Sequence, residues 1–119
     1  MAKMAELSSL DLHIEQAYSR GSVPASDGTA MSLAPHTIDR GAGEALRDLA
    51  IAEGARRTIE VGLALGLSAL YLCRAVSERA GRHVAVDPFQ HESWGGAGLR
   101  TLRDAGAEQI VEVIEEETE

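Results

Sequence analysis

Two glycines stand four residues apart in the stretch IEVGLALGLSALYL, between a short β-branched run and an apolar segment of helical periodicity. Glycine has no Cβ and tolerates positive φ, so Gly62 and Gly66 let the backbone turn sharply and approach another group closely. If residues 58–61 form a strand and a helix begins near Leu67, this turn lies at the carboxyl end of the strand. Free amides at a helix start favour an anionic group. Doubly wound sheets bind ligands in the crevice at the carboxyl ends of their strands, where this turn lies. The stretch therefore predicts an α/β fold with a ligand-binding turn.

The rest of the chain alternates helical and strand patterns, which implies parallel pairing with right-handed crossovers. The segment between the two N-terminal helices is dense in Gly, Pro, Ser and Asp and is expected to form a lid-like loop. The second of those helices has a Thr or Asp as its N-cap. The expected order is a helix over 4–20, the loop over 21–35, a helix over 37–53, a strand over 58–61, a helix from 67, a strand over 83–87, a helix within 95–106 and a strand near 110–114.

Composition and charge limit the partners that the chain can have. Its 119 residues suffice for one core, and 19 acidic against 11 basic residues give a net charge of -8. Such a charge disfavours nucleic acid and anionic membranes as partners. Cys73 is the only cysteine, so no intrachain disulfide can form and a buried thiol in a reducing compartment is expected. The N-terminus contains neither a secretory signal nor a membrane span, and a cytoplasmic location is expected.

An acidic residue at the end of the second strand is the next clue to the ligand. Asp87 closes HVAVD and lies 21 positions beyond Gly66. This separation is typical of a carboxylate that accepts from the ribose hydroxyls of an adenosine. In the context of strand, turn, helix and strand, the glycines and this acid together indicate a nucleotide-type cofactor.

These residues carry a resemblance to a known family. EVGLALGLSALYL followed by HVAVDPF resembles the first two nucleotide-binding motifs of class I S-adenosylmethionine-dependent methyltransferases, and ExGxxxGxS resembles their small O-methyltransferase-like branch. The resemblance covers residues 37–116 and includes GLRTLRDAG, which resembles the helix after the second strand. It implies S-adenosylmethionine or S-adenosylhomocysteine as ligand and an unidentified small molecule as methyl acceptor. The cofactor-binding residues that it implies are Glu60, Gly62, Leu63, Ala64, Gly66, Ser68, Asp87, Pro88 and Phe89.

The resemblance also implies a role for each of these residues. Glu60 would hold the cofactor's ammonium, directly or through water, and the glycine turn would take the methionine portion. Ser68 would meet its carboxylate, and Asp87 would bind the ribose. Pro88 and Phe89 would border the adenine. The sulfonium is positively charged, so an acidic pocket suits it, and methyl transfer needs chiefly the positioning of a nucleophile.

An incomplete sheet follows from the same resemblance. A complete methyltransferase of this kind has a Rossmann-like parallel sheet of seven strands ordered 3-2-1-4-5-7-6, and this chain supplies only strands one to three. Residues 1–36 would be an N-terminal helix and lid-like loop, and residues 37–119 a partial cofactor-binding domain. Strand one would then be an edge that invites pairing. The chain is expected to be a truncated half, to complete its sheet as a homodimer, or to place another strand there.

Two other functions stay open. A nicotinamide dinucleotide-binding fold shares the strand, turn, helix and acid, although the pattern GxGxxG is absent. A non-catalytic assembly module would use the open sheet edge to recruit a partner. No catalytic residue is identified, and His91 with Glu92 is too few ligands for a metal site, so no metal is expected. Trp94 is expected to anchor the following helix rather than to cover an adenine, and His36 to be solvated.

Overall fold

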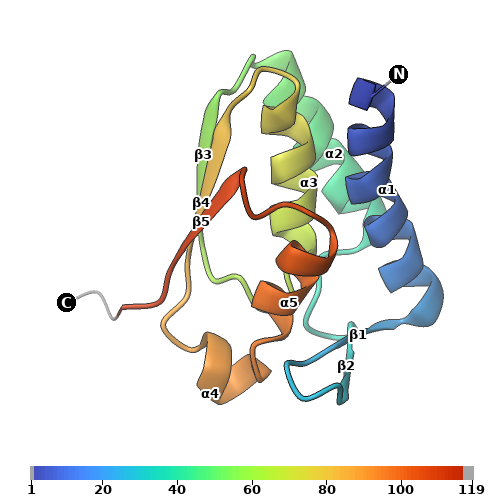
Figure 1. Ribbon diagram of the computed structural model, residues 1–119, viewed down its shortest axis with the longest axis vertical. Coiled ribbons are helices and arrows are strands. Elements are labelled where there is room, and N and C mark those ends of the chain that lie inside the picture. The colour runs from blue at the N-terminus through green and yellow to red at the C-terminus, as the bar shows by residue number, and fades with distance from the viewer. Residues whose placement is uncertain (1, 117–119) are drawn as a thin grey trace.

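The computed structural model describes residues 2–116, with side chains from residue 9 onward. Five helices and five strands follow one another along this part of the chain (Figure 1). They are α1 (Ala2–Arg20), β1 (Ser22–Pro24), β2 (Ala30–Ser32), α2 (Arg40–Ala52), β3 (Arg57–Val61), α3 (Leu67–Ser77), β4 (Arg82–Val86), α4 (Gln90–Trp94), α5 (Ala97–Asp104) and β5 (Val111–Ile114).

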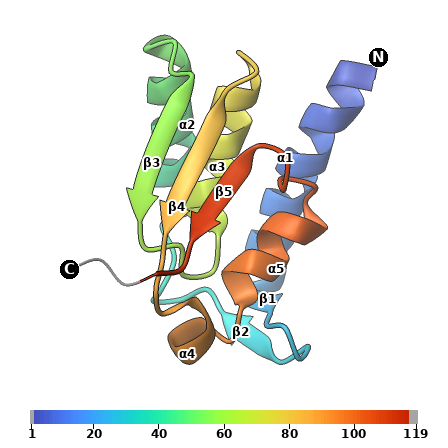
Figure 2. The same ribbon diagram turned by 60° about the vertical axis from the view of Figure 1, so that its left-hand side comes forward.

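The central feature is a three-stranded parallel sheet in the order β3-β4-β5 (Figure 2). Thr58 of β3 lies opposite His83 of β4, and His83 lies opposite Val111 of β5. Within the described residues β3 pairs with β4 alone, so its other side is an edge of the sheet. This arrangement confirms the predicted α/β class and the partial Rossmann-like sheet with flanking helices.

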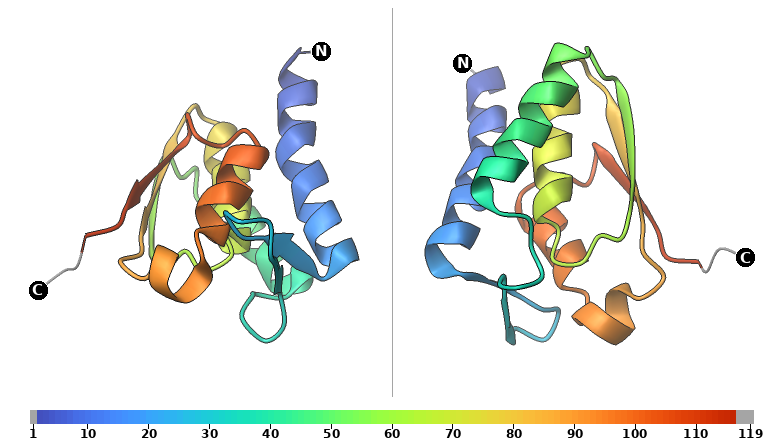
Figure 3. Two further views of the ribbon diagram at one scale, coloured as in Figure 1. Left: turned by 60° about the horizontal axis from the view of Figure 1, so that its bottom comes forward. Right: turned by 180° about the vertical axis from the view of Figure 1, so that it is seen from behind.

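All of the helices that pack on the sheet lie on one of its faces, and α1 packs in turn on α3 (Figure 3). Because side chains alternate along a strand, Thr58 and Glu60 point toward these helices and are half-buried. The intervening Ile59 and Val61 are 70% and 84% exposed. One face of the sheet is therefore part of the core, and the other is bare within the described residues.

Helix α3 forms the centre of the core. Eight of its eleven residues are buried, which fits a helix with a wide apolar surface. The core is mainly aliphatic, with Tyr71 of α3 also fully buried, and Leu10 and Ile14 of α1 contribute to it. Cys73 is fully buried here, and that burial, together with the charge of Glu60, raises the pKa of its thiol to about 12. The prediction of a buried thiol is confirmed.

The prediction of a loop over residues 21–35 is wrong in part, because this segment contains the antiparallel hairpin of β1 and β2. Asp27 explains the turn, since its Oδ1 accepts the N–H of Thr29 at 2.9 Å in a local side-chain turn. The N–H of Ala25 donates to the carbonyl of Thr29 and closes the hairpin. A short strand of three residues is too brief to show a periodic pattern in the sequence. The lid role of this segment stays a prediction.

The N-cap of α2 and the segment after β4 are defined by the structure. Asp39, and not Thr37, is the N-cap of α2, because its Oδ1 accepts the N–H of Ala42 at 2.8 Å. The short helix α4 was not predicted and lies at the carboxyl ends of the strands. Among residues 2–116, none of the helices combines the length and the apolar content that a membrane span requires.

Candidate cofactor-binding site

The turn between β3 and α3 has the backbone that the two glycines predict. Gly62 and Gly66 adopt φ of 92° and 91°, and Gly66 is the N-cap of α3. A Cβ on Gly62 would meet nothing within 4 Å, so this glycine serves the conformation and leaves open space beside the turn. A Cβ on Gly66 would lie 3.2 Å from the carbonyl oxygen of Gly98, so the second glycine also lets α5 approach.

Asp87 holds this turn in place. Its Oδ2 accepts the N–H groups of Leu63 and Ala64, each at 3.1 Å, and its Oδ1 accepts the N–H of Phe89 at 3.0 Å. The residue is only 3% exposed, so these bonds compensate for the burial of its charge. The structure thus brings the predicted acid to the glycine turn, while its role at a ribose stays a prediction.

Gln90 also holds the glycine turn in place, although the sequence did not predict this role. Its side chain is fully buried and its Nε2 donates both to the carbonyl of Ala64 at 3.0 Å and to Oδ2 of Asp87 at 3.1 Å. Its Oε1 accepts the N–H groups of Gly98 at 2.6 Å and Leu99 at 3.2 Å. One amide therefore joins the glycine turn to the start of α5. No spacing rule marks a glutamine for this task, so the sequence offered no signal.

Glu60 lies at the other side of the turn, between the sheet and α3. Its Oε2 accepts the hydroxyl of Ser68 at 2.7 Å, and its Oε1 lies 3.0 Å from Nε2 of His83. Nδ1 of His83 is in turn 2.8 Å from the hydroxyl of Thr58. The side chain of Glu60 is 16% exposed, so the carboxylate is positioned by protein groups and still reaches solvent. Glu60 and Ser68, both predicted site residues, are thus in direct contact.

A cavity of about 160 Å³ adjoins the turn. It is lined by His36, Thr37 and Ile38 from the segment before α2 and by every residue from 62 to 68. The ring of Trp94 contacts that of His36 edge-on, with 5.2 Å between centroids, and Trp94 also packs against the core. A larger cavity of about 420 Å³ lies elsewhere, beside α5 and β5, and shares no lining residue with the first.

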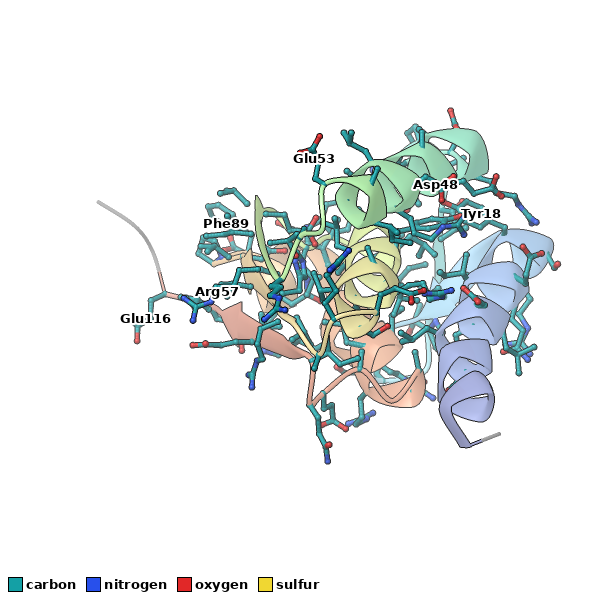
Figure 4. The ribbon with its side chains drawn as sticks, turned by 90° about the horizontal axis from the view of Figure 1, so that it is seen from above. Tyr18, Asp48, Glu53, Arg57, Phe89 and Glu116 are labelled. Carbon is teal, nitrogen blue, oxygen red and sulfur yellow. The ribbon has the colours of Figure 1, made fainter. Side chains whose placement is uncertain are left out.

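The remaining candidates lie at the margin of the site. Pro88 is half-buried, and Phe89 is 51% exposed and lies on the side of the sheet away from α1 (Figure 4). His91 is exposed and pairs with Glu115 at 2.9 Å rather than with Glu92. Within residues 2–116, no group of three or more His, Cys, Asp and Glu side chains converges as metal ligands would.

Comparison with known proteins gives matches among solved structures only. No protein-family model and no curated protein matches the chain. The cofactor-bound structure of Rv0187 from MTB is 26% identical, with a TM-score of 0.60 over 95% of this chain. The O-methyltransferase TomG from Streptomyces achromogenes, involved in Tomaymycin synthesis and solved with SAM, is 25% identical, with a TM-score of 0.59 over 89% of this chain. The O-methyltransferase from Bacillus cereus, solved with SAH, is 24% identical, with a TM-score of 0.62 over 89%.

The extent of the match is asymmetric. This chain spans 41–42% of the length of those structures, although they account for nearly all of its own residues. The chain therefore has the fold of the N-terminal part of S-adenosylmethionine-dependent O-methyltransferases.

Proposed function

We propose that the chain is the S-adenosylmethionine-binding part of a methyltransferase whose complete form transfers a methyl group to a small molecule. The observation that carries this proposal is the joint placement of Glu60, the glycine turn and Asp87 at the carboxyl end of the sheet. Ligands of doubly wound sheets bind at this edge. The likeness to structures solved with SAM and SAH supports the same ligand here.

The chemistry of the site fits this cofactor. The cofactor has an ammonium group, and Glu60 offers a carboxylate that is already oriented by two hydrogen bonds. The open space beside Gly62 allows the ligand to approach bare backbone. Ser68 at the start of α3 lies where the helix dipole favours a carboxylate. The carboxylate of Glu60 is thus present for the ammonium, and the start of α3 for the carboxylate, of the cofactor's amino-acid group.

The size of the cavity limits which portion of the ligand it takes. Pockets for drug-sized ligands span roughly 300–1,000 Å³, whereas this cavity holds about 160 Å³. The amino-acid portion of the cofactor fits this volume better than the whole nucleoside does. The adenosine would then lie outside it, toward Asp87, Pro88 and the exposed Phe89.

Bound S-adenosylmethionine would supply a methyl group on a positively charged sulfur. The residues of this chain would fix the amino-acid and ribose portions and so orient that methyl group toward an acceptor. The acceptor site, the attacking atom and any general base belong to the complete protein. The activity of this chain by itself is therefore not part of the proposal.

The ligand is tested by titration calorimetry of the chain with SAH and, separately, with NAD. The proposal predicts saturable heat with SAH and none with NAD, because the turn has the spacing GxxxG and lacks GxGxxG. The Glu60→Gln variant should bind SAH at least tenfold more weakly, since it loses the charge that faces the ammonium. Binding of NAD in place of SAH would favour the dinucleotide-binding alternative and overturn the proposal.

A second part of the proposal concerns assembly. The exposed Ile59 and Val61 stand on the bare face of the edge strand β3, whose outer backbone groups have no strand partner within the described residues. An apolar edge strand of this kind pairs readily with another chain. We therefore include a homodimer formed through β3 in the proposal, and a dimer that binds no cofactor would favour the assembly-module alternative.

A further inference from the structure

His83 is a buried titratable residue to which the proposed function gives no role. It sits near the start of β4 on the face that packs against the helices and is 0% exposed. On the same face of the sheet its neighbours Ala85 of β4 and Val111 of β5 are apolar, and its other strand neighbour, Thr58 of β3, is polar. A polar ring in such surroundings is costly unless both nitrogens are hydrogen-bonded. Both are, and the bond to Glu60 leads toward the candidate site.

The bonds of His83 have a fixed direction. The carboxylate of Glu60 only accepts, so Nε2 of His83, 3.0 Å away, must carry a hydrogen and donate it. In the neutral ring Nδ1 then accepts, and the donor is the hydroxyl of Thr58 at 2.8 Å. Thr58 lies directly opposite His83 in the sheet, so the register itself sets this pair. The chain of bonds runs from Thr58 through His83 to Glu60.

We propose that His83 is a positioning residue that holds the Glu60 carboxylate in the orientation that receives the ammonium of the cofactor. The hydroxyl of Ser68 in α3 donates to Oε2 of Glu60, and Nε2 of His83 in β4 donates to Oε1. A carboxylate held at both oxygens has little rotamer freedom left to lose when a ligand binds. This inference rests on the proposed function, because it assigns the ammonium to Glu60.

A purely structural role for His83 would have a different consequence. If the ring only tied β3 to β4, its loss would loosen the sheet and weaken every ligand at the site alike. If it positions Glu60, its loss would weaken only ligands that carry the ammonium. SAH and 5′-methylthioadenosine differ in this respect, because both contain the adenosine and only SAH has the amino-acid group.

The experiment measures the affinities of both ligands for the unmodified chain and for three variants. His83→Leu removes both hydrogen bonds of the ring, and His83→Gln keeps a donor toward Glu60. Thr58→Val removes only the bond between Thr58 and His83 and preserves the shape of the side chain. The inference predicts that His83→Leu weakens SAH about tenfold and leaves 5′-methylthioadenosine within twofold. His83→Gln should recover most of the SAH affinity, and Thr58→Val should produce an intermediate loss. Equal losses for the two ligands would overturn the positioning role.

A measurement without ligand separates this inference from the proposed function. Nitrogen-15 chemical shifts of the His83 ring in the unmodified chain should show a hydrogen on Nε2, and a ring protonated on Nδ1 alone would overturn the inference directly. In the Glu60→Gln background, His83→Leu should weaken SAH no further, because the carboxylate that it positions is gone. If the unmodified chain binds neither SAH nor 5′-methylthioadenosine, the proposed function is wrong. The positioning role of His83 is then wrong as well, even if the nitrogen-15 shifts show a hydrogen on Nε2.

Discussion

Gly62 and Gly28 form a matched pair of residues that separates the cost of backbone strain from the effect on a ligand. Their φ values are 92° and 89°, and a Cβ on either would meet nothing within 4 Å. Only Gly62 lines the cavity at the glycine turn. Alanine at either position should therefore cost about 1–2 kcal/mol of folding free energy through left-handed strain.

The two variants should differ in ligand binding. Gly62→Ala should weaken SAH at least tenfold, because the methyl group enters the space that the ligand needs, and Gly28→Ala should leave the affinity unchanged. Chemical denaturation gives the stabilities and calorimetry the affinities. Equal SAH affinities for the two variants would show that the open space at Gly62 takes no part in binding.

Cys73 allows a test of the core at the scale of a single group. Burial raises the pKa of its thiol to about 12, above its usual value near 9. The unfolded chain therefore loses this proton first, and this group's contribution to stability falls as the pH rises from about 9 toward 12. Cys73→Ala should flatten that part of the stability profile. The native thiol should also resist a disulfide reagent at pH 8 and react once the chain is denatured, and fast reaction in the native state would contradict the described burial.

Some residues of the candidate site could be predicted from the sequence, and others could not. The spacing of Gly62, Gly66 and Asp87 predicted that they meet, because the carboxyl ends of parallel strands share one edge. The partners that hold them, Gln90 and His83, carry no such signal. Their importance comes from burial and from hydrogen bonds across elements, and both depend on the finished fold.

At the scale of elements, the contact of α2 with α3 depends on one small residue. Gly43 of α2 lies so close to Tyr71 of α3 that a Cβ there would overlap the ring. Tyr71 is 1% exposed and cannot move aside. Gly43→Ala should therefore destabilise the fold by about 1–3 kcal/mol through overpacking.

Gly41 provides the matched control in the same helix. A Cβ on Gly41 would make an ordinary contact of 3.5 Å with Oδ1 of Asp39. Alanine has the higher helix propensity, so Gly41→Ala should be neutral or stabilise by up to about 1 kcal/mol. Thermal denaturation of both variants makes the comparison, and similar melting temperatures would contradict the close packing of α2 on α3.

Elements of helical or strand periodicity were predicted well, and the short ones were not. Helices α1, α2, α3 and α5 span two turns or more and repeat their apolar positions, which the sequence displays. The hairpin strands have three residues each and α4 has five. Their formation depends on a local turn at Asp27 and on contacts with the rest of the molecule, which periodicity cannot reveal.

At the scale of the whole molecule, the bare sheet face predicts association. Val61 is 84% exposed on the edge strand, so Val61→Lys should leave the fold intact and reduce pairing through β3. Leu49→Lys on α2, at a position 60% exposed and outside the sheet, is the control. Sedimentation should show a concentration-dependent dimer for the unmodified chain and the control, and mainly monomer for Val61→Lys. A monomer in all three would contradict the homodimer.

The most direct test of the central claim is to map where SAH binds on the folded chain by nuclear magnetic resonance. The cavity at the glycine turn and the larger cavity beside α5 and β5 share no lining residue, so the amides that shift show which of them takes the ligand. We expect the largest shifts at residues 36–38 and 60–68, with smaller ones near Asp87. Shifts confined to residues 99–103 and 111–113, or no shifts at all, would contradict this expectation.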